Sequence, residues 1–165
     1  MKRIILIMGL VMVFSVGRNA FAFDNETSRE RIRGITGIHV AIYVQPFFLK
    51  YEGLSKSKIQ TDVESELRLA GIKVLTKQEL KKEKGQPVFY IFINGMKGPG
   101  NTLVYEVGVR LMQDASLVRK PNYTFLAPTW EVGTVGFGDR KNIQTAIKDK
   151  VDQFINAYLS VNPKT

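Results

Sequence analysis

Residues 88–111, VFYIFINGMKGPGNTLVYEVGVRL, set the architecture of this chain. The first seven residues form a nearly continuous apolar run, which is too short for a helix of its own and typical of a buried strand. A segment rich in turn residues follows at 95–101, and a period-two pattern runs from Leu103 to Leu111. This order predicts a β-hairpin whose first arm lies in the middle of a sheet.

Further strands are expected on both sides of this hairpin. The second arm should extend to a turn at 120–122, after which residues 123–135 return as another strand. Pro128 cannot donate a ladder hydrogen bond, so it predicts an edge strand or a bulge. Upstream, a period-two pattern rich in β-branched residues predicts a first strand at 36–45, and residues 72–75 form a short apolar strand.

Two main helices complete the expected fold. Ser55 or Ser57 can cap a helix that ends at Gly71, and Asn142 can cap a long final helix with one broad apolar stripe. Residues 76–79 have the capping-box spacing that starts a short helix. The order of elements predicts an α+β fold, a two-layer sandwich in which two main helices lie on one face of a mainly antiparallel sheet of four to five strands.

Composition excludes several kinds of chemistry. The chain has 165 residues, of which 44% are apolar and 24% charged, and this mixture suits one globular domain. It has no cysteine, which excludes a disulfide scaffold, a thiolate nucleophile, an iron–sulfur cluster, a thiol-bound zinc and the acylated cysteine of a lipoprotein. One histidine, His39, leaves no multi-histidine metal site. We therefore expect no metal and no cofactor.

The N-terminal segment has the pattern of a secretory signal. Two basic residues precede an apolar run at 4–14, which is shorter than the roughly 18 to 20 residues that cross a bilayer. Ala20 and Ala22 supply the small residues that a signal peptidase needs. We predict a signal peptide at 1–22, cleaved after Ala22, and a periplasmic or secreted protein. The alternative is an uncleaved N-terminal membrane anchor.

The remaining chain divides into a leader and one domain. Residues 23–34 are polar and charged without a sustained apolar period, so they predict a flexible leader. A single α+β domain is expected over 35–162. No second apolar stretch approaches the length of a membrane span.

The charge of the chain points to anionic partners. The formal net charge is +9, and removal of 1–22 would take away three basic residues and no acidic one, which leaves +6. An exported basic protein meets anionic envelope polymers, membrane surfaces and proteins, so nucleic acid is not expected as a partner. The basic residues are scattered, and their densest run, at 77–84, is typical of a solvated helix face.

Catalytic signals are few. His39 is the only candidate for a general base at neutral pH, and no spacing in the sequence supplies it with a partner, so we expect a structural or exposed histidine. Glu64 and Glu66 lie two apart on a helix and point to different sides, unlike the convergent carboxylates of a glycosidase. No serine has a G-x-S-x-G setting. We therefore expect no enzyme activity, and we rank a hydrolase below the binding functions.

Glycines before the last helix suggest an anion site. Gly133, Gly136 and Gly138 precede a helix N-terminus, where free backbone N–H groups could hold an anion. Their order, G-x-x-G-x-G, fits neither a dinucleotide fingerprint nor a P-loop, so a plain strand-to-helix connection is the favoured interpretation. The candidate anion-binding residues are Gly136, Gly138, Arg140 and Lys141.

Aromatic residues gather in the segment after the first strand. Phe47, Phe48 and Tyr51 lie where a polar loop would be ordinary. They form either an exposed contact surface or a cover over the end of the core. We take these three residues as the candidate binding residues.

The stretch SELRLAGIKVLT, at 65–76, is a predicted helix that runs through a glycine turn into a small strand. With the meander and helix that follow, it resembles the envelope domains of the TolB N-terminal and CsgG-like type, and also small exported bacterial proteins of this length. The resemblance implies protein contacts or assembly in the periplasm rather than catalysis. The leading hypothesis is an exported binding or adaptor module that acts on an envelope protein through a sheet edge or the aromatic loop. The alternative is a binder of a small ligand or an anionic envelope polymer.

Overall fold

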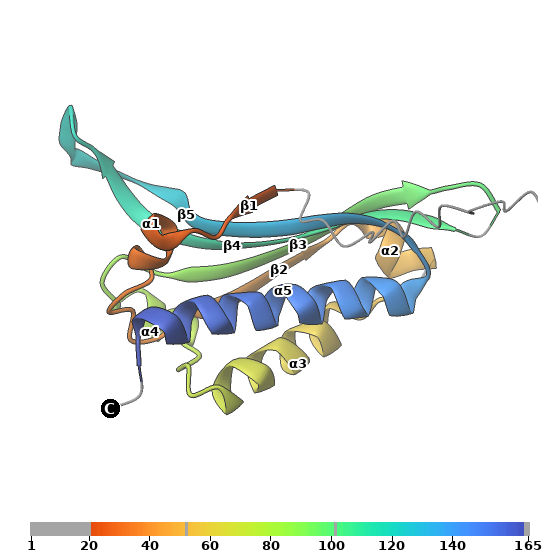
Figure 1. Ribbon diagram of the computed structural model, residues 1–165, viewed down its shortest axis with the longest axis horizontal. Helices are drawn as coiled ribbons and strands as arrows, with labels where there is room; N and C mark the ends of the chain where they lie inside the picture. The colour runs from red at the N-terminus through yellow and green to blue at the C-terminus, as the bar shows by residue number, and fades with distance from the viewer. Residues whose placement is uncertain (1–20, 52, 101, 164–165) are drawn as a thin grey trace, which may run out of the picture.

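The computed structural model describes residues 21–163 except 52 and 101, and it has an α+β fold (Figure 1). The five-stranded sheet has the order β1-β5-β4-β3-β2. β2 pairs with β3 in parallel, and the other neighbouring pairs are antiparallel. The strands are β1 (Phe21–Phe23), β2 (His39–Val44), β3 (Val88–Lys97), β4 (Leu103–Leu117) and β5 (Lys120–Gly138).

The helices are α1 (Glu26–Glu30), α2 (Pro46–Tyr51), α3 (Lys56–Leu69), α4 (Lys77–Leu80) and α5 (Arg140–Val161). The two longest, α3 and α5, lie on the same face of the sheet (Figure 1). Their apolar stripes bury Ile59, Val63 and Leu67 from α3 and Ile143, Ile147, Val151 and Phe154 from α5. The predicted sandwich of two main helices on one face of a mainly antiparallel sheet is confirmed.

Local signals place most of these elements correctly. Ser55 caps α3 by accepting the N–H of Lys58, and Gly71 follows the helix with a φ of 85°. The bulge expected at Pro128 is present, because Leu111 pairs with Trp130 whereas Met112 pairs with Pro128. The backbone shifts register at this point instead of breaking the strand.

Three expectations about individual elements are wrong. The last helix begins one turn before Asn142, because Asp139 is the N-cap and Asn142 is its reciprocal capping-box partner. The segment after the first strand is the helix α2 and not a loop, with Pro46 at its first position, where the missing N–H removes no helical hydrogen bond. Residues 72–75 form only an isolated parallel bridge, from Val74 to Ile38.

The expected flexible leader is also wrong within the described residues. Ser28 and Ile32 are fully buried, and α1 packs against α5 and β5. Asp24 accepts hydrogen bonds from Arg29 Nε at 2.6 Å and from the indole Nε1 of Trp130 at 3.1 Å. This segment therefore belongs to the folded domain. Almost all of the predicted signal peptide lies outside the described residues.

The short helix α4 provides a test of pH dependence. Glu79 accepts hydrogen bonds from the backbone N–H and the hydroxyl of Thr76, at 2.8 and 2.9 Å, and pairs with Lys73 at 3.2 Å. These donors, the Thr76 N–H foremost, lower the pKa of Glu79 from 4.5 to about 2. A depressed pKa in the folded state gives stability that is complete above about pH 4.5 and is lost as the pH falls toward 2.

We expect Glu79→Gln to remove this part of the pH dependence, because glutamine accepts the same hydrogen bonds without titrating. The measurement is urea unfolding of both proteins at a series of pH values between 2 and 7. The free energies of unfolding should converge as the pH falls. A constant difference across that range would contradict the prediction.

Candidate functional site

Two of the three candidate aromatic residues, Phe47 and Phe48, do not form an exposed surface. Phe48 is fully buried in the core, and Phe47 is half-buried with its ring edge-on to Phe48 at 5.3 Å between centroids. The side chain of Tyr51 lies outside the described part of the chain. Because α2 turns Phe48 inward beneath the end of β3, these rings cover the end of the core, which was the other interpretation open from the sequence.

The candidate anion site is occupied by the chain's own side chains. The Asp139 carboxylate accepts the N–H groups of Lys141 and Asn142, at 2.8 and 3.1 Å, and Asn142 accepts the N–H of Asp139 at 2.9 Å. A negative charge already lies at the helix N-terminus, where an external anion would have to bind. Gly136 is held against the Tyr105 ring and Gly138 against Asn142. Arg140 extends instead into a groove between α3 and α5.

The candidate acid–base residues have structural contacts. His39 Nδ1 lies 2.8 Å from the carbonyl oxygen of Leu75, next to the first strand. Glu64 accepts hydrogen bonds from Gln60 and Arg68 on its own helix. Glu66 lies 3.7 Å from Lys148 on α5, and partial burial raises its pKa. The described residues contain no cluster of three or more histidines and acids that could hold a metal ion.

We call the face of the sheet opposite α3 and α5 the outer face. Side chains of the strands themselves cover its centre. The Phe92 ring occupies the space above Gly108, and the Arg110 guanidinium lies 4.5 Å from the centre of that ring. Arg110 also pairs with Glu131 at 2.5 Å, and Tyr90 stacks beside Phe92. Phe92 is therefore buried although it has no helix above it.

One end of the outer face is open and apolar. Met96, Val104 and Phe137 are direct cross-strand neighbours on β3, β4 and β5, and their exposed fractions are 67%, 38% and 70%. Val135, two residues before Phe137 on the same face, is 55% exposed. We call these four side chains the apolar end. Clustered exposed apolar residues of this kind mark contact surfaces more often than isolated ones do.

Among the described strands, none covers the edge of the sheet beside the apolar end. β1 pairs with Glu131, Val132 and Gly133 of β5. Beyond that pairing, no strand that the structure describes pairs with residues 134–138 on the side away from β4. An unpaired edge presents backbone N–H and C=O groups that can accept a further strand. The apolar end and this edge therefore form one continuous candidate surface.

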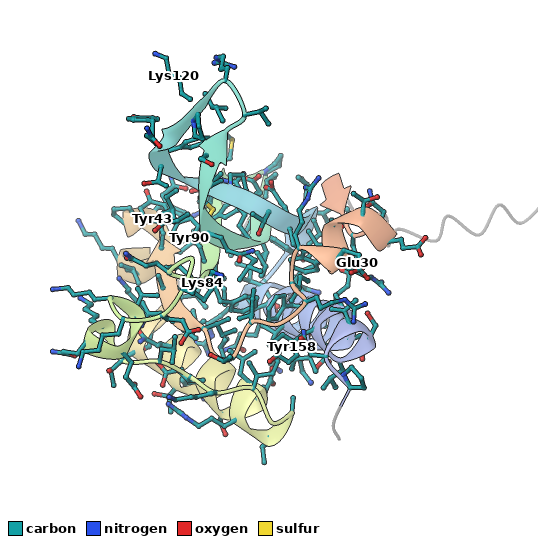
Figure 2. The ribbon with its side chains drawn as sticks, turned by 90° about the vertical axis from the view of Figure 1, so that its left-hand side faces the viewer. Glu30, Tyr43, Lys84, Tyr90, Lys120 and Tyr158 are labelled. Atoms are coloured by element: carbon teal, nitrogen blue, oxygen red, sulfur yellow. The ribbon has the colours of Figure 1, made fainter. Side chains whose placement is uncertain are left out.

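The β4–β5 hairpin continues beyond the sheet as a two-stranded arm. Lys120 lies at its tip, far from the helices (Figure 2). Val118 is fully exposed at the turn, and Tyr123 and Phe125 stack on the arm at 6.3 Å between ring centroids. This arm is a second exposed region, but its apolar side chains are spread along the strands and around the turn.

The sequence contains one local signal for the apolar end. Val104, Val135 and Phe137 occupy the alternate positions that a half-buried strand gives to solvent, where polar residues are ordinary. Their convergence with Met96 follows only from the pairing register. The candidate surface therefore required the structure.

No helix in the described part of the chain is long and apolar enough to cross a membrane. No protein-family model matches the chain, and no curated protein matches it. Its function is therefore inferred from the sequence and the geometry alone.

Proposed function

We propose that this protein is an exported, non-catalytic binding module of the bacterial cell envelope that holds a partner protein against the apolar end and the adjoining edge of β5. The observation that carries the proposal is the cross-strand row of Met96, Val104 and Phe137, which is exposed on three neighbouring strands. Rigid strands present these side chains in fixed positions, as a binding surface requires.

The partner that fits this surface is an extended segment that adds a strand to β5. Residues 134–138 carry no charged side chain, so the approaching backbone meets no charge that it must displace. Strand addition takes its affinity from main-chain hydrogen bonds and its specificity from alternate side chains, here those that contact Val135 and Phe137. The positive net charge of the chain favours an acidic partner segment.

Export and an envelope location are supported by the sequence. The basic and apolar pattern at 1–22 predicts a signal peptide, and the resemblance to TolB N-terminal and CsgG-like domains implies protein contacts in the periplasm. The absence of cysteine and the contacts of His39 and Glu64 favour binding over catalysis.

The test is crosslinking of the tagged, exported protein in cells, followed by mass spectrometry of the captured proteins. One dominant envelope protein is expected with the natural sequence. The double variant Met96→Ser, Phe137→Ser should reduce its capture at least about thirtyfold, because central apolar anchors dominate binding energy. Val118→Ser is the matched control, since it removes a fully exposed apolar side chain from the hairpin arm instead.

Two results would overturn the proposal. One is the absence of any enriched protein with the natural sequence, after which sedimentation with anionic envelope polymers would test the alternative function. The other is equal capture by the double variant and the Val118→Ser control. Circular dichroism of each purified variant shows whether the fold is retained.

A further inference from the structure

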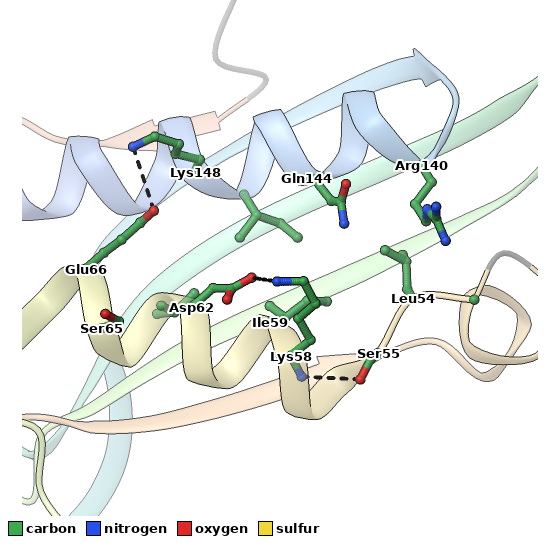
Figure 3. A pocket seen from close by; sticks show the side chains of 13 residues that line it. Leu54, Ser55, Lys58, Ile59, Asp62, Ser65, Glu66, Arg140, Gln144 and Lys148 are labelled. Carbon is green, nitrogen blue, oxygen red and sulfur yellow. Dashed lines mark hydrogen bonds and ion pairs between the residues drawn. The ribbon is translucent and has the colours of Figure 1, made fainter.

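A groove of about 650 Å³ lies between α3 and α5, on the face of the sheet opposite the apolar end (Figure 3). Its volume is in the range of sites that hold small molecules. Buried apolar side chains from both helices and from the chain before α3 line its floor, namely Leu54, Ile59, Val63 and Ile147. The groove therefore has an apolar floor that is held in place by two helices.

One end of the groove is closed by paired charges. Lys148 on α5 lies 3.7 Å from Glu66 on α3 and 3.0 Å from Asp152 on its own helix. Near the middle, Lys58 pairs with Asp62 at 2.8 Å along α3. These cations are already neutralised by carboxylates of the fold, so this part of the groove has little excess charge to offer a ligand.

The other end carries a cation, Arg140, that is not paired with any carboxylate of the described residues. The guanidinium of Arg140, the first residue of α5, makes no hydrogen bond or ion pair with any residue that the structure describes. One of its terminal nitrogens lies beside Gly53, 3.5 Å from where a Cβ would stand. Figure 3 shows Arg140 and Gln144 extending from α5 toward the groove, above Leu54. A guanidinium without a partner among the described residues thus lies at the rim of an apolar floor.

We propose that this groove binds a small amphiphilic anion, with the apolar body on the floor and a carboxylate or phosphate head on Arg140. The planar guanidinium suits both head groups, because it can donate two parallel hydrogen bonds to a pair of anionic oxygens. The Gln144 amide can donate a further hydrogen bond one turn along the helix. The asymmetry of the groove sets the direction of the ligand, since the lysines at the other end and near the middle are already paired with Glu66 and Asp62.

The test uses the purified protein and isothermal titration calorimetry, with every amphiphile below its micelle concentration. Decanoate and decyl phosphate are the anionic probes, decanol is the neutral probe and decyltrimethylammonium is the cationic probe. The two anions should bind with a stoichiometry of one, and the neutral and cationic probes at least about tenfold less tightly. Equal binding of decanol, or no binding of either anion, would overturn the proposal.

Arg140→Gln should weaken decanoate binding about tenfold or more, because the carboxylate loses its charge-assisted hydrogen bonds to the guanidinium. Lys141→Gln is the matched control: it removes the same charge from the next residue, which does not line the groove. Gln144→Trp should block binding by filling the groove from an exposed position. Unchanged affinity in Arg140→Gln would show that Arg140 does not bind the head group. Equal losses in Arg140→Gln and Lys141→Gln would show general attraction between charges. Either result would overturn the proposed site.

These results are independent of the partner surface. Arg140→Gln should leave capture of the envelope protein unchanged, and the double variant of Met96 and Phe137 should bind decanoate normally. A failure of one proposal is therefore distinguishable from a failure of the other.

Discussion

Replacing Trp130 with alanine is expected to lower the free energy of unfolding by about 3 to 5 kcal/mol, measured by urea denaturation. The indole is fully buried and lies edge-on to Phe154, with 5.2 Å between ring centroids. Its Nε1 donates to Asp24 at 3.1 Å, across a separation of 106 residues in the chain. The substitution therefore removes packing at the centre of the core and one of the contacts that hold the N-terminal segment against the sheet.

Trp130→Phe separates these two effects. Phenylalanine keeps much of the ring contact with Phe154 but has no N–H for Asp24, which stays paired with Arg29 at 2.6 Å. We expect an intermediate loss of about 1 to 3 kcal/mol. Faster hydrogen exchange at α1 in Trp130→Phe, with the rest of the sheet unchanged, would locate the loss at the N-terminal segment. A loss below about 1 kcal/mol in Trp130→Ala would contradict the packing described.

Gly95→Ala is the second substitution for which a large effect is expected, a loss of about 2 to 5 kcal/mol. Gly95 has a φ of 156°, and a Cβ added there would overlap the carbonyl oxygen of Val104 and lie 2.9 Å from the Cα of Tyr105. It would also lie 2.8 Å from the Phe48 ring. Because two of these neighbours are backbone atoms of β4, the hairpin itself must separate to admit the methyl group.

Gly34→Ala is the control for the effect of the dihedral angle alone. Gly34 also has a positive φ, of 77°, but no atom lies within 4 Å of the added Cβ. Its substitution should cost about 1 to 2 kcal/mol, the conformational penalty without the collision. Equal losses of unfolding free energy in the two variants would show that the close approach of β3 and β4 at Gly95 adds nothing to the cost of the substitution. Unfolding of all three proteins in urea provides the comparison.

Features encoded by neighbouring residues were predictable from the sequence. The cap at Ser55, the capping box of Thr76 and Glu79 and the bulge at Pro128 each depend on residues a few positions apart. The long hairpin was also predictable, since its alternation and its turn lie in one continuous stretch. Backbone hydrogen-bonding rules act over the same short range, which is why these signals were sufficient.

Features that depend on distant residues were not predictable in this way. Residues 24–34 looked unstructured because only Ser28 and Ile32 among them are buried, and their hydrogen bond to Trp130 spans 106 residues of the chain. Arg140 was a candidate anion-binding residue because of the glycines before it. It lines a groove between α3 and α5 instead, because α5 begins one turn earlier than expected. Asp139 and Asn142 are both good caps, and only the three-dimensional arrangement distinguishes them.

The parallel pairing of β2 with β3 has a consequence for the order of folding. His39 pairs with Val88, which lies 49 residues later in the chain, whereas β3, β4 and β5 are joined by two short turns. During synthesis β2 is made before its partner β3, and the helical segment between them is also made before β3. The apolar residues of β2 therefore remain unpaired until β3 is complete. We expect the antiparallel strands β3, β4 and β5 to form first, and the newly made chain to depend on chaperones until β3 is complete.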